Sequence, residues 1–303
     1  MPLIDDQGDQ PDKGNIARYY DIAAEKYFEQ YRRENLAQGK KYAQNYYRLQ
    51  LIIQRLATLR SRSVYEVGTG DGTPLALMAR MGYSVAGCDI SEKMVELTRQ
   101  RLKEMDIGEG CVQWGDIEDS LTIANQLRAG CFDAVIALGV MPHVGKDLLA
   151  LKNMRMFLDV GGSIFVEFRN KLLSLFSFNR YTKEFILDDL LADVADDIKT
   201  VVARELDARL DLDHPPRRQS YDGEMSYDDI KAKFHNPFEM EELFAKAAFT
   251  DLRFHWYHYH PAIPKLEHEI KERFWEEARR LEHTSSWRGY FLCSAFVVEA
   301  KAI

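Results

Sequence analysis

The sequence lacks the features that mark membrane, disulfide-stabilised and nucleic-acid-binding proteins. No apolar run approaches the roughly 18 residues that a bilayer-spanning helix needs, and the first ten residues are acidic and polar, unlike a signal peptide. Only four cysteines occur and they form no C-x-x-C pair, so we expect reduced thiols in a cytoplasmic protein. The net charge of -8 opposes binding to nucleic acid phosphates, which requires clustered Lys and Arg.

Apolar strand-like segments alternate with helical segments in the middle of the 303-residue chain. Alternation of this kind is typical of a parallel sheet covered by helices on both faces. The sequence therefore predicts an α/β fold with a doubly wound, mostly parallel sheet. Strands are expected near residues 63, 84, 111, 132 and 163, and helices at 73–81, 91–105 and 146–158.

A loop with glycine at every second position follows the first of these strands. Gly68, Gly70 and Gly72 come directly after the apolar segment 64–67 and precede a helix. Such a loop brings bare backbone amides up to a ligand at the switch point of an α/β sheet. The dinucleotide fingerprint G-x-G-x-x-G would need glycine where the chain has Thr73. A nucleotide-like cofactor is predicted, and an NAD-linked oxidoreductase is kept as a weaker alternative.

Four segments resemble, in order, the motifs of a known family. The run Glu66-x-Gly68-x-Gly70-x-Gly72 resembles motif I of the class I S-adenosylmethionine (SAM) dependent methyltransferases of the small-molecule type. Residues 89–94 resemble the D-x-S-x-x-M passage into that family's second helix, 112–117 its third strand with the following acidic residue, and 132–144 its fourth strand. The resemblance implies a seven-stranded Rossmann-like sheet whose last strand is antiparallel.

The resemblance also implies SAM as the cofactor. Glu66 would orient the loop or reach the amino end of the ligand, and Asp116 would read the adenine amino group. Asp89 follows the glycines by about twenty residues, where a carboxylate can accept hydrogen bonds from both ribose hydroxyls. Apolar residues would flank the purine, and a strand backbone would lie beside the methionine moiety. The predicted cofactor contacts are Tyr27, Glu66, Gly68, Thr69, Gly70, Gly72, Asp89, Ile90, Met94, Asp116, Ile117 and Leu138.

Segments outside the motif-bearing core have expected roles of their own. Residues 19–27 resemble the helix that closes over SAM in many small-molecule members, although Tyr20, Ala24 and Tyr27 are equally spaced for plain core packing. The predicted organisation is a disordered tail (1–13), an N-terminal helical lid (14–60), a SAM-binding core (61–169), an inserted cap (170–235) and a C-terminal part of the core with a substrate-side strand and helix (236–303).

Two histidines are candidates for a catalytic base. His143 follows the fourth strand, at the edge where ligands bind in open α/β sheets, and a reference pKa of about 6.5 suits removal of a hydroxyl proton. A hydrogen-bonded histidine in the turn after Pro142 is the structural alternative. His258 is the second candidate.

The segment 254–261 is rich in aromatic and imidazole side chains. On a strand, Trp256, His258 and His260 share one face, which suits the wall of a substrate pocket. A packed edge strand and a metal site stay open, but no third ligand lies nearby and methyl transfer needs none, so no metal is predicted. Arg169 and Tyr181 are further substrate candidates, since they could hold a carboxylate or phosphate of the acceptor.

These expectations combine into one functional hypothesis. The chain is identified as a SAM-dependent methyltransferase that transfers a methyl group to a small-molecule acceptor, with an oxygen nucleophile favoured because histidines are available as bases. An N-methyltransferase of a small amine, an NAD-linked oxidoreductase and a catalytically silent interaction protein with the same fold stay open. The expected partner is the acceptor, with no nucleic acid and no membrane, and a homodimer is left open.

Overall fold

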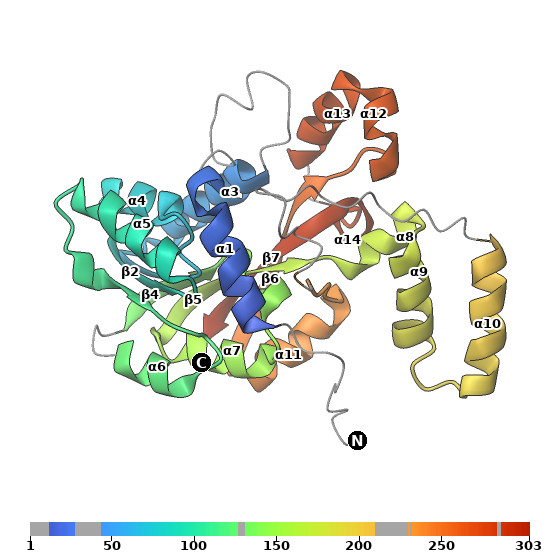
Figure 1. The fold of residues 1–303 in the computed structure, drawn as a ribbon, viewed down its shortest axis with the longest axis horizontal. Helices are drawn as coiled ribbons and strands as arrows, with labels where there is room; N and C mark the ends of the chain where they lie inside the picture. Colours follow the sequence, from blue (N-terminus) through green and yellow to red (C-terminus); the bar gives the residue numbers. More distant parts are fainter. Residues whose placement is uncertain (1–11, 28–43, 127–130, 210–229, 231, 284–285) are drawn as a thin grey trace.

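The computed structural model describes residues 12–27, 44–126, 131–209, 230, 232–283 and 286–303, and a seven-stranded sheet forms its centre (Figure 1). The strands lie in the order β3-β2-β1-β4-β5-β7-β6. Their bounds are β1 (Ser63–Val67), β2 (Ser84–Asp89), β3 (Val112–Trp114), β4 (Phe132–Ala137), β5 (Leu158–Arg169), β6 (Phe249–Tyr259) and β7 (Cys293–Ala302).

The pairing of the strands defines the edge at which a ligand can bind. Strands β1 to β5 pair in parallel, whereas β7 lies antiparallel between β5 and β6. The chain leaves β1 first towards β2 and β3, and later returns to its other side through β4. Ligands of open α/β sheets bind at such a switch point, beyond the carboxyl ends of the strands. The predicted doubly wound, mostly parallel fold is therefore confirmed.

Helices cover both faces of this sheet, and each face buries its own apolar cluster. Because side chains alternate along a strand, Val64 joins α3, α4 and α5 on one face while Tyr65 joins α6, α7 and α11 on the other. The helices are α3 (Gln44–Leu59), α4 (Thr73–Arg80), α5 (Glu92–Lys103), α6 (Ser120–Gln126), α7 (Asp147–Arg155) and α11 (Met240–Lys246).

The N-terminal helix α1 (Lys13–Tyr27) packs against α5 (Figure 1). It begins at the last residue of the predicted tail. The Asp12 carboxylate accepts hydrogen bonds from the backbone amides of Gly14 and Asn15, at 2.9 and 3.2 Å, which satisfies two of the amides that a helix start leaves without partners.

The segment between β5 and α11 carries several short helices. In Figure 1, α9 and α10 lie beside each other, away from the sheet, and an ion pair of 2.7 Å between Lys183 and Asp207 joins them. Residues 210–229 lie outside the described part, and the assignment of 170–235 as an inserted cap stays a prediction. The elements are η5 (Lys171–Leu173), α8 (Ser174–Ser177), α9 (Arg180–Glu184), η6 (Phe185–Leu190) and α10 (Asp196–Arg209).

Two strand boundaries differ from the predicted ones. Strand β5 starts before the glycine pair at 161 and 162, because Gly161 adopts a φ of +77° and the pairing with β4 shifts register there, as in a bulge. The sequence also predicts a final strand over 289–298, but this segment opens with the helical turn α14 before β7, since a short apolar run fits either structure. The remaining elements are η2 (Glu109–Cys111), η4 (Met141–His143), η8 (Pro237–Glu239), η9 (Pro264–Leu266), α12 (Glu267–Ile270), α13 (Glu272–Glu282) and α14 (Gly289–Leu292).

Within the described ranges, no helix combines the length and the apolar character that crossing a bilayer requires.

Candidate functional site

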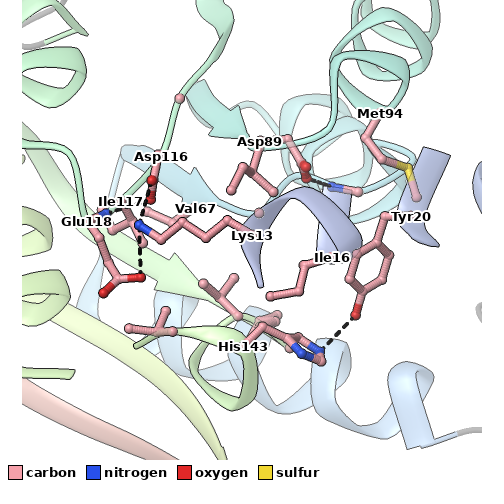
Figure 2. A pocket seen from close by; sticks show the side chains of 18 residues that line it. Lys13, Ile16, Tyr20, Val67, Asp89, Met94, Asp116, Ile117, Glu118 and His143 are labelled. Atoms are coloured by element: carbon pink, nitrogen blue, oxygen red, sulfur yellow. Dashed lines mark hydrogen bonds and ion pairs between the residues drawn. The ribbon is translucent and has the colours of Figure 1, made fainter. Parts of the chain in front are cut away.

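A pocket lies at the switch point, at the carboxyl ends of β1, β2 and β4 and beside α1 (Figure 2). The pocket brings together nine of the predicted site residues, and nine further residues complete its wall. The predicted ones are Gly68, Gly70, Asp89, Ile90, Met94, Asp116, Ile117, Leu138 and His143. The others are Lys13, Ile16, Tyr20, Val67, Gly115, Glu118, Gly139, Val140 and Val144.

The glycine loop after β1 is shaped by positive φ angles and close packing. Gly68 has a φ of +74°, and a Cβ atom there would lie 2.5 Å from Cγ2 of Val140. A Cβ at Gly72 would lie 2.9 Å from Thr98 on α5, so this glycine allows close helix packing and does not line the pocket. The loop therefore needs glycine for two different steric reasons.

Asp89 ties the end of β2 to this loop. Its carboxylate accepts hydrogen bonds from the backbone amides of Gly70 (2.8 Å) and Ser91 (2.9 Å). Burial raises the pKa of Asp89 to about 6, although these amides act in the opposite direction. A carboxylate has about four acceptor positions, so two stay available for ligand hydroxyls.

The end of the pocket near β3 contains paired charges. The Nζ atom of Lys13, from the first turn of α1, lies 2.7 Å from Oδ2 of Asp116 and 3.1 Å from Oε2 of Glu118 (Figure 2). Burial lowers the pKa of Lys13, but the hydrogen bonds to both carboxylates outweigh it and leave that pKa raised. Sequence reasoning missed Lys13 and Glu118, because nothing local links a residue of the tail to the third strand.

A tryptophan flanks the same end of the pocket from outside. The indole nitrogen of Trp114 donates a hydrogen bond of 2.8 Å to the carbonyl of Ile90, whose side chain lines the pocket. The Trp114 side chain itself is 45% exposed.

The opposite end of the pocket is apolar except for one histidine and one tyrosine. His143, in η4 after β4, lies 3.1 Å through Nε2 from the hydroxyl of Tyr20 on α1 (Figure 2). Leu138, Val140 and Val144 add apolar surface to the wall of the same pocket. The structure therefore places an imidazole inside the pocket, and Tyr20 is an addition that the helix spacing alone did not reveal.

A buried polar cluster lies directly behind this wall. Glu167 of β5 accepts hydrogen bonds from Arg48 of α3 and from the hydroxyl of Tyr257 of β6. Gly139 lines the pocket, and a Cβ atom there would lie 3.8 Å from Nη1 of Arg48 and 3.9 Å from Oε2 of Glu167, so this glycine joins the pocket wall to the cluster. The sequence could have indicated Glu167, because it is a charged residue inside the otherwise apolar strand 163–168.

Two predicted cofactor residues lie behind the pocket wall, and the side chain of a third is not described. Glu66 does not line the pocket; burial raises the pKa of its carboxyl well above the ordinary value, and its Oε2 atom has no hydrogen-bond partner among the described residues. Thr69 is buried under the loop, 3.3 Å from the hydroxyl of Thr98. Tyr27 ends α1, but its side chain is not among the described ones.

The aromatic residues of β6 lie outside the pocket. Trp256 packs on Gly289 and Phe296. His258 is hydrogen-bonded through Nδ1 to Ser294 at 2.5 Å, and its ring lies 4.7 Å from that of His260. Burial lowers the pKa of His260 to about 4, so this side chain is neutral at pH 7. Among the described residues no cluster of three or more metal-ligating side chains forms.

The remaining substrate candidates lie where the core meets the segment after β5. The guanidinium of Arg169 lies 5.8 Å from the ring centre of Phe234, and Tyr181 packs on the same phenylalanine at 4.7 Å between ring centres. Neither residue lines the pocket, and their roles towards a substrate stay predictions.

Comparison with known proteins identifies the domain that contains this pocket. Residues 65–166 match the methyltransferase domain family. Curated relatives include the ubiquinone biosynthesis O-methyltransferases of Histophilus somni (strain 2336), 28% identical over 52% of this chain and 66% of the relative, and of Caulobacter vibrioides, 28% identical over 43% and 50%. The chain thus aligns with between half and two thirds of these relatives' length.

Solved structures share the fold. The magnesium protoporphyrin IX methyltransferase of Synechocystis PCC 6803 superposes over 96% of this chain and 100% of that chain, with a TM-score of 0.50 and 16% identity. The (4+2)-cyclase SpnF superposes over 97% of both chains, with a TM-score of 0.51 and 13% identity. Together with the domain match, the shared fold supports the resemblance to the class I SAM-dependent methyltransferases.

Proposed function

We propose that the protein transfers a methyl group from SAM to a hydroxyl group of a small molecule. The observation that carries the proposal is the division of one pocket into two ends: Asp89 and Asp116 lie at one end, and His143 lies in apolar surroundings at the other.

The residues at the first end fit the adenosine part of SAM. Gly68 lines the pocket with backbone atoms alone, because a Cβ there would overlap Val140, and Asp89 keeps acceptor positions for ribose hydroxyls. Asp116 can accept from an amino group of the purine once Lys13 shifts towards Glu118, which already shares this cation. When bound, SAM supplies an electrophilic methyl group on a good leaving group, so the protein mainly has to align the acceptor and exclude water.

The second end supports an uncharged hydroxylated acceptor. The pocket's single Lys or Arg is Lys13, which lies at the other end and is paired with two carboxylates, so no cation among the described lining residues is placed to bind an acidic acceptor. His143 can remove the hydroxyl proton as the bond to carbon forms. The relatives named as ubiquinone biosynthesis O-methyltransferases support oxygen as the acceptor atom.

The test combines binding and turnover. S-adenosylhomocysteine should raise the melting temperature of the protein. If NAD raises the melting temperature and S-adenosylhomocysteine does not, an oxidoreductase is favoured instead. Radiolabelled SAM is then offered with matched phenols, catechols and aromatic amines. We expect methylation of hydroxyl compounds and a loss of about 10²-fold or more in kcat for His143→Ala. Methylation of amines alone, unaffected by His143→Ala, would favour N-methylation, and no transfer to any acceptor would favour a silent member of the fold.

A further inference from the structure

We propose that Tyr20 is a catalytic residue that relays the acceptor's proton to His143. The inference rests on the proposed function, because it concerns the route by which a hydroxyl acceptor loses its proton. It starts from the contact between the Tyr20 hydroxyl and Nε2 of His143, at 3.1 Å, inside the wall of the pocket (Figure 2).

The Tyr20 side chain is directed into the pocket by the periodicity of α1. Lys13, Ile16 and Tyr20 are three and four residues apart, share one helix face and all line the pocket. Tyr19, the neighbouring residue, does not line the pocket and packs with Ile16, Ala23 and Ile230, where its ring meets the Tyr20 ring edge-on at 5.2 Å between centres. The tyrosine in the pocket is thus fixed by the helix register.

Contacts on both sides of Tyr20 hold α1 in this position. Lys13 binds Asp116 and Glu118 at the start of the helix. Asp21 accepts a hydrogen bond from the hydroxyl of Ser91, the residue that caps α5. The hydroxyl of Tyr20 is therefore held at the imidazole by bonds that do not involve His143 itself.

This placement decides which atom an acceptor can reach. Nε2 of His143 already faces the Tyr20 hydroxyl, and the ring lies edge-on to the Tyr20 ring, with centres 5.8 Å apart. His143 is only 8% exposed. Because the Tyr20 hydroxyl occupies Nε2, the relay makes the Tyr20 oxygen the partner for the acceptor's hydroxyl group.

The proton steps balance without any additional reagent. The relay requires a resting state in which the Tyr20 hydroxyl donates to Nε2 and His143 carries its proton on Nδ1. As the acceptor oxygen forms its bond to the methyl carbon and the carbon–sulfur bond breaks, the acceptor's proton passes to the Tyr20 oxygen. The original Tyr20 proton passes to Nε2. The tyrosine ends unchanged, and the imidazolium releases its proton to solvent after product leaves.

Replacing Tyr20 with Phe tests the relay during turnover. We expect Tyr20→Phe to lower kcat by about 10²-fold while S-adenosylhomocysteine affinity changes less than about twofold, since only a proton-transfer group is lost. Tyr19→Phe, one residue away and outside the pocket wall, is the matched control and should keep normal turnover. In mixed light and heavy water, the wild-type rate should show two protons in flight. A Tyr20→Phe variant with at least half the wild-type kcat would overturn the relay.

A measurement on the ligand-free protein separates this inference from the proposed function. Nitrogen NMR of labelled histidine should show Nε2 of His143 as an unprotonated, hydrogen-bonded nitrogen, and this signal should shift in Tyr20→Phe but not in Tyr19→Phe. An Nε2 that carries the proton in the neutral ring would refute the relay even if methyl transfer occurs. Wild-type protein that methylates no hydroxyl compound refutes the proposed function, whatever the NMR result.

Discussion

The charge of Asp89, which is hydrogen-bonded to the glycine loop after β1, depends on pH. Asp89 is buried, holds two backbone amides and has a pKa of about 6, so near neutral pH a small change in acidity changes its charge. Ribose hydroxyls donate hydrogen bonds, which the ionised carboxylate accepts most strongly.

We therefore expect the affinity for S-adenosylhomocysteine to rise from pH 5 to pH 7, with a midpoint near the Asp89 pKa of about 6. Titration calorimetry across this range measures it. Asp89→Asn should weaken binding at pH 7 by about 1–3 kcal/mol and remove the pH dependence. Asp133→Asn is a matched control, because Asp133 also holds two backbone amides, those of Arg62 and Ser63, but at the opposite end of β1. An unchanged pH profile in Asp89→Asn contradicts the assignment.

Gly68 offers a steric prediction. In Gly68→Ala the positive φ costs about 1–2 kcal/mol, and overlap with Val140 adds about 1–3 kcal/mol. Gly82→Ala separates the backbone contribution from the overlap contribution. Gly82 has a φ of +90° and a Cβ there would meet no atom within 4 Å, so Gly82→Ala should show the backbone contribution alone. Urea unfolding gives both values. Adding Val140→Ala to Gly68→Ala should restore part of the lost free energy of unfolding. If the double variant restores none, the destabilisation by Gly68→Ala comes from the backbone alone.

Helix α3 is held on the sheet by two arginine–glutamate pairs on one of its faces. Arg48 binds Glu167 and, one heptad later, Arg55 binds Glu299 of β7 with two hydrogen bonds of 2.6 and 2.7 Å. His255 adds a third contact to Glu299 at 2.7 Å. Burial raises the pKa of Glu299, but hydrogen bonds from His255 and Arg55 outweigh it and lower the pKa to about 2.

The lowered pKa fixes the sign of a pH effect on stability. The ionised form of Glu299 is favoured by folding, so its contribution is complete above the ordinary pKa of 4.5 and is lost as the pH falls towards 2. We expect Glu299→Gln to lower the free energy of unfolding by roughly 2–4 kcal/mol at pH 7. In urea titrations the difference from wild type should shrink between pH 5 and pH 3. Glu242, which forms an ion pair with Lys246 on the surface, provides the control. Glu242→Gln should leave the midpoint of urea unfolding unchanged.

The sequence predicted the parallel core because strong apolar runs and punctuating glycines are local signals. It missed α6, whose short segment shows no clear period, and it extended the last strand into α14. Asp89 and Asp116, which line one pocket, were predicted as site residues because they follow successive strands. Lys13 and Tyr20 were not, because their partners lie more than 100 residues away and only tertiary packing joins them.

At the scale of the whole molecule, helix α1 lines the pocket and is tied to the core by polar contacts of Lys13 and Asp21. If Lys13 holds α1 against the core, Lys13→Met should speed hydrogen exchange of the α1 amides about three- to tenfold, since an ion pair of this exposure contributes modestly. Mass spectrometry of exchange measures it. Lys93→Met removes a comparable pair with Glu96 on the surface of α5 and should leave α1 unaffected. Equal exchange in both variants would show that other contacts hold the helix.

Trp114 gives the molecule a built-in optical reporter. Its indole is about half exposed and donates a hydrogen bond to the carbonyl of Ile90. A ligand that contacts Ile90 should therefore change the polarity around the indole. Emission from the native chain can then follow occupancy of the end of the pocket near β3 during rapid mixing, without a dye. Replacing Trp114 with Phe identifies its share of the signal among the four tryptophans, and the order in which donor and acceptor enter becomes measurable in real time.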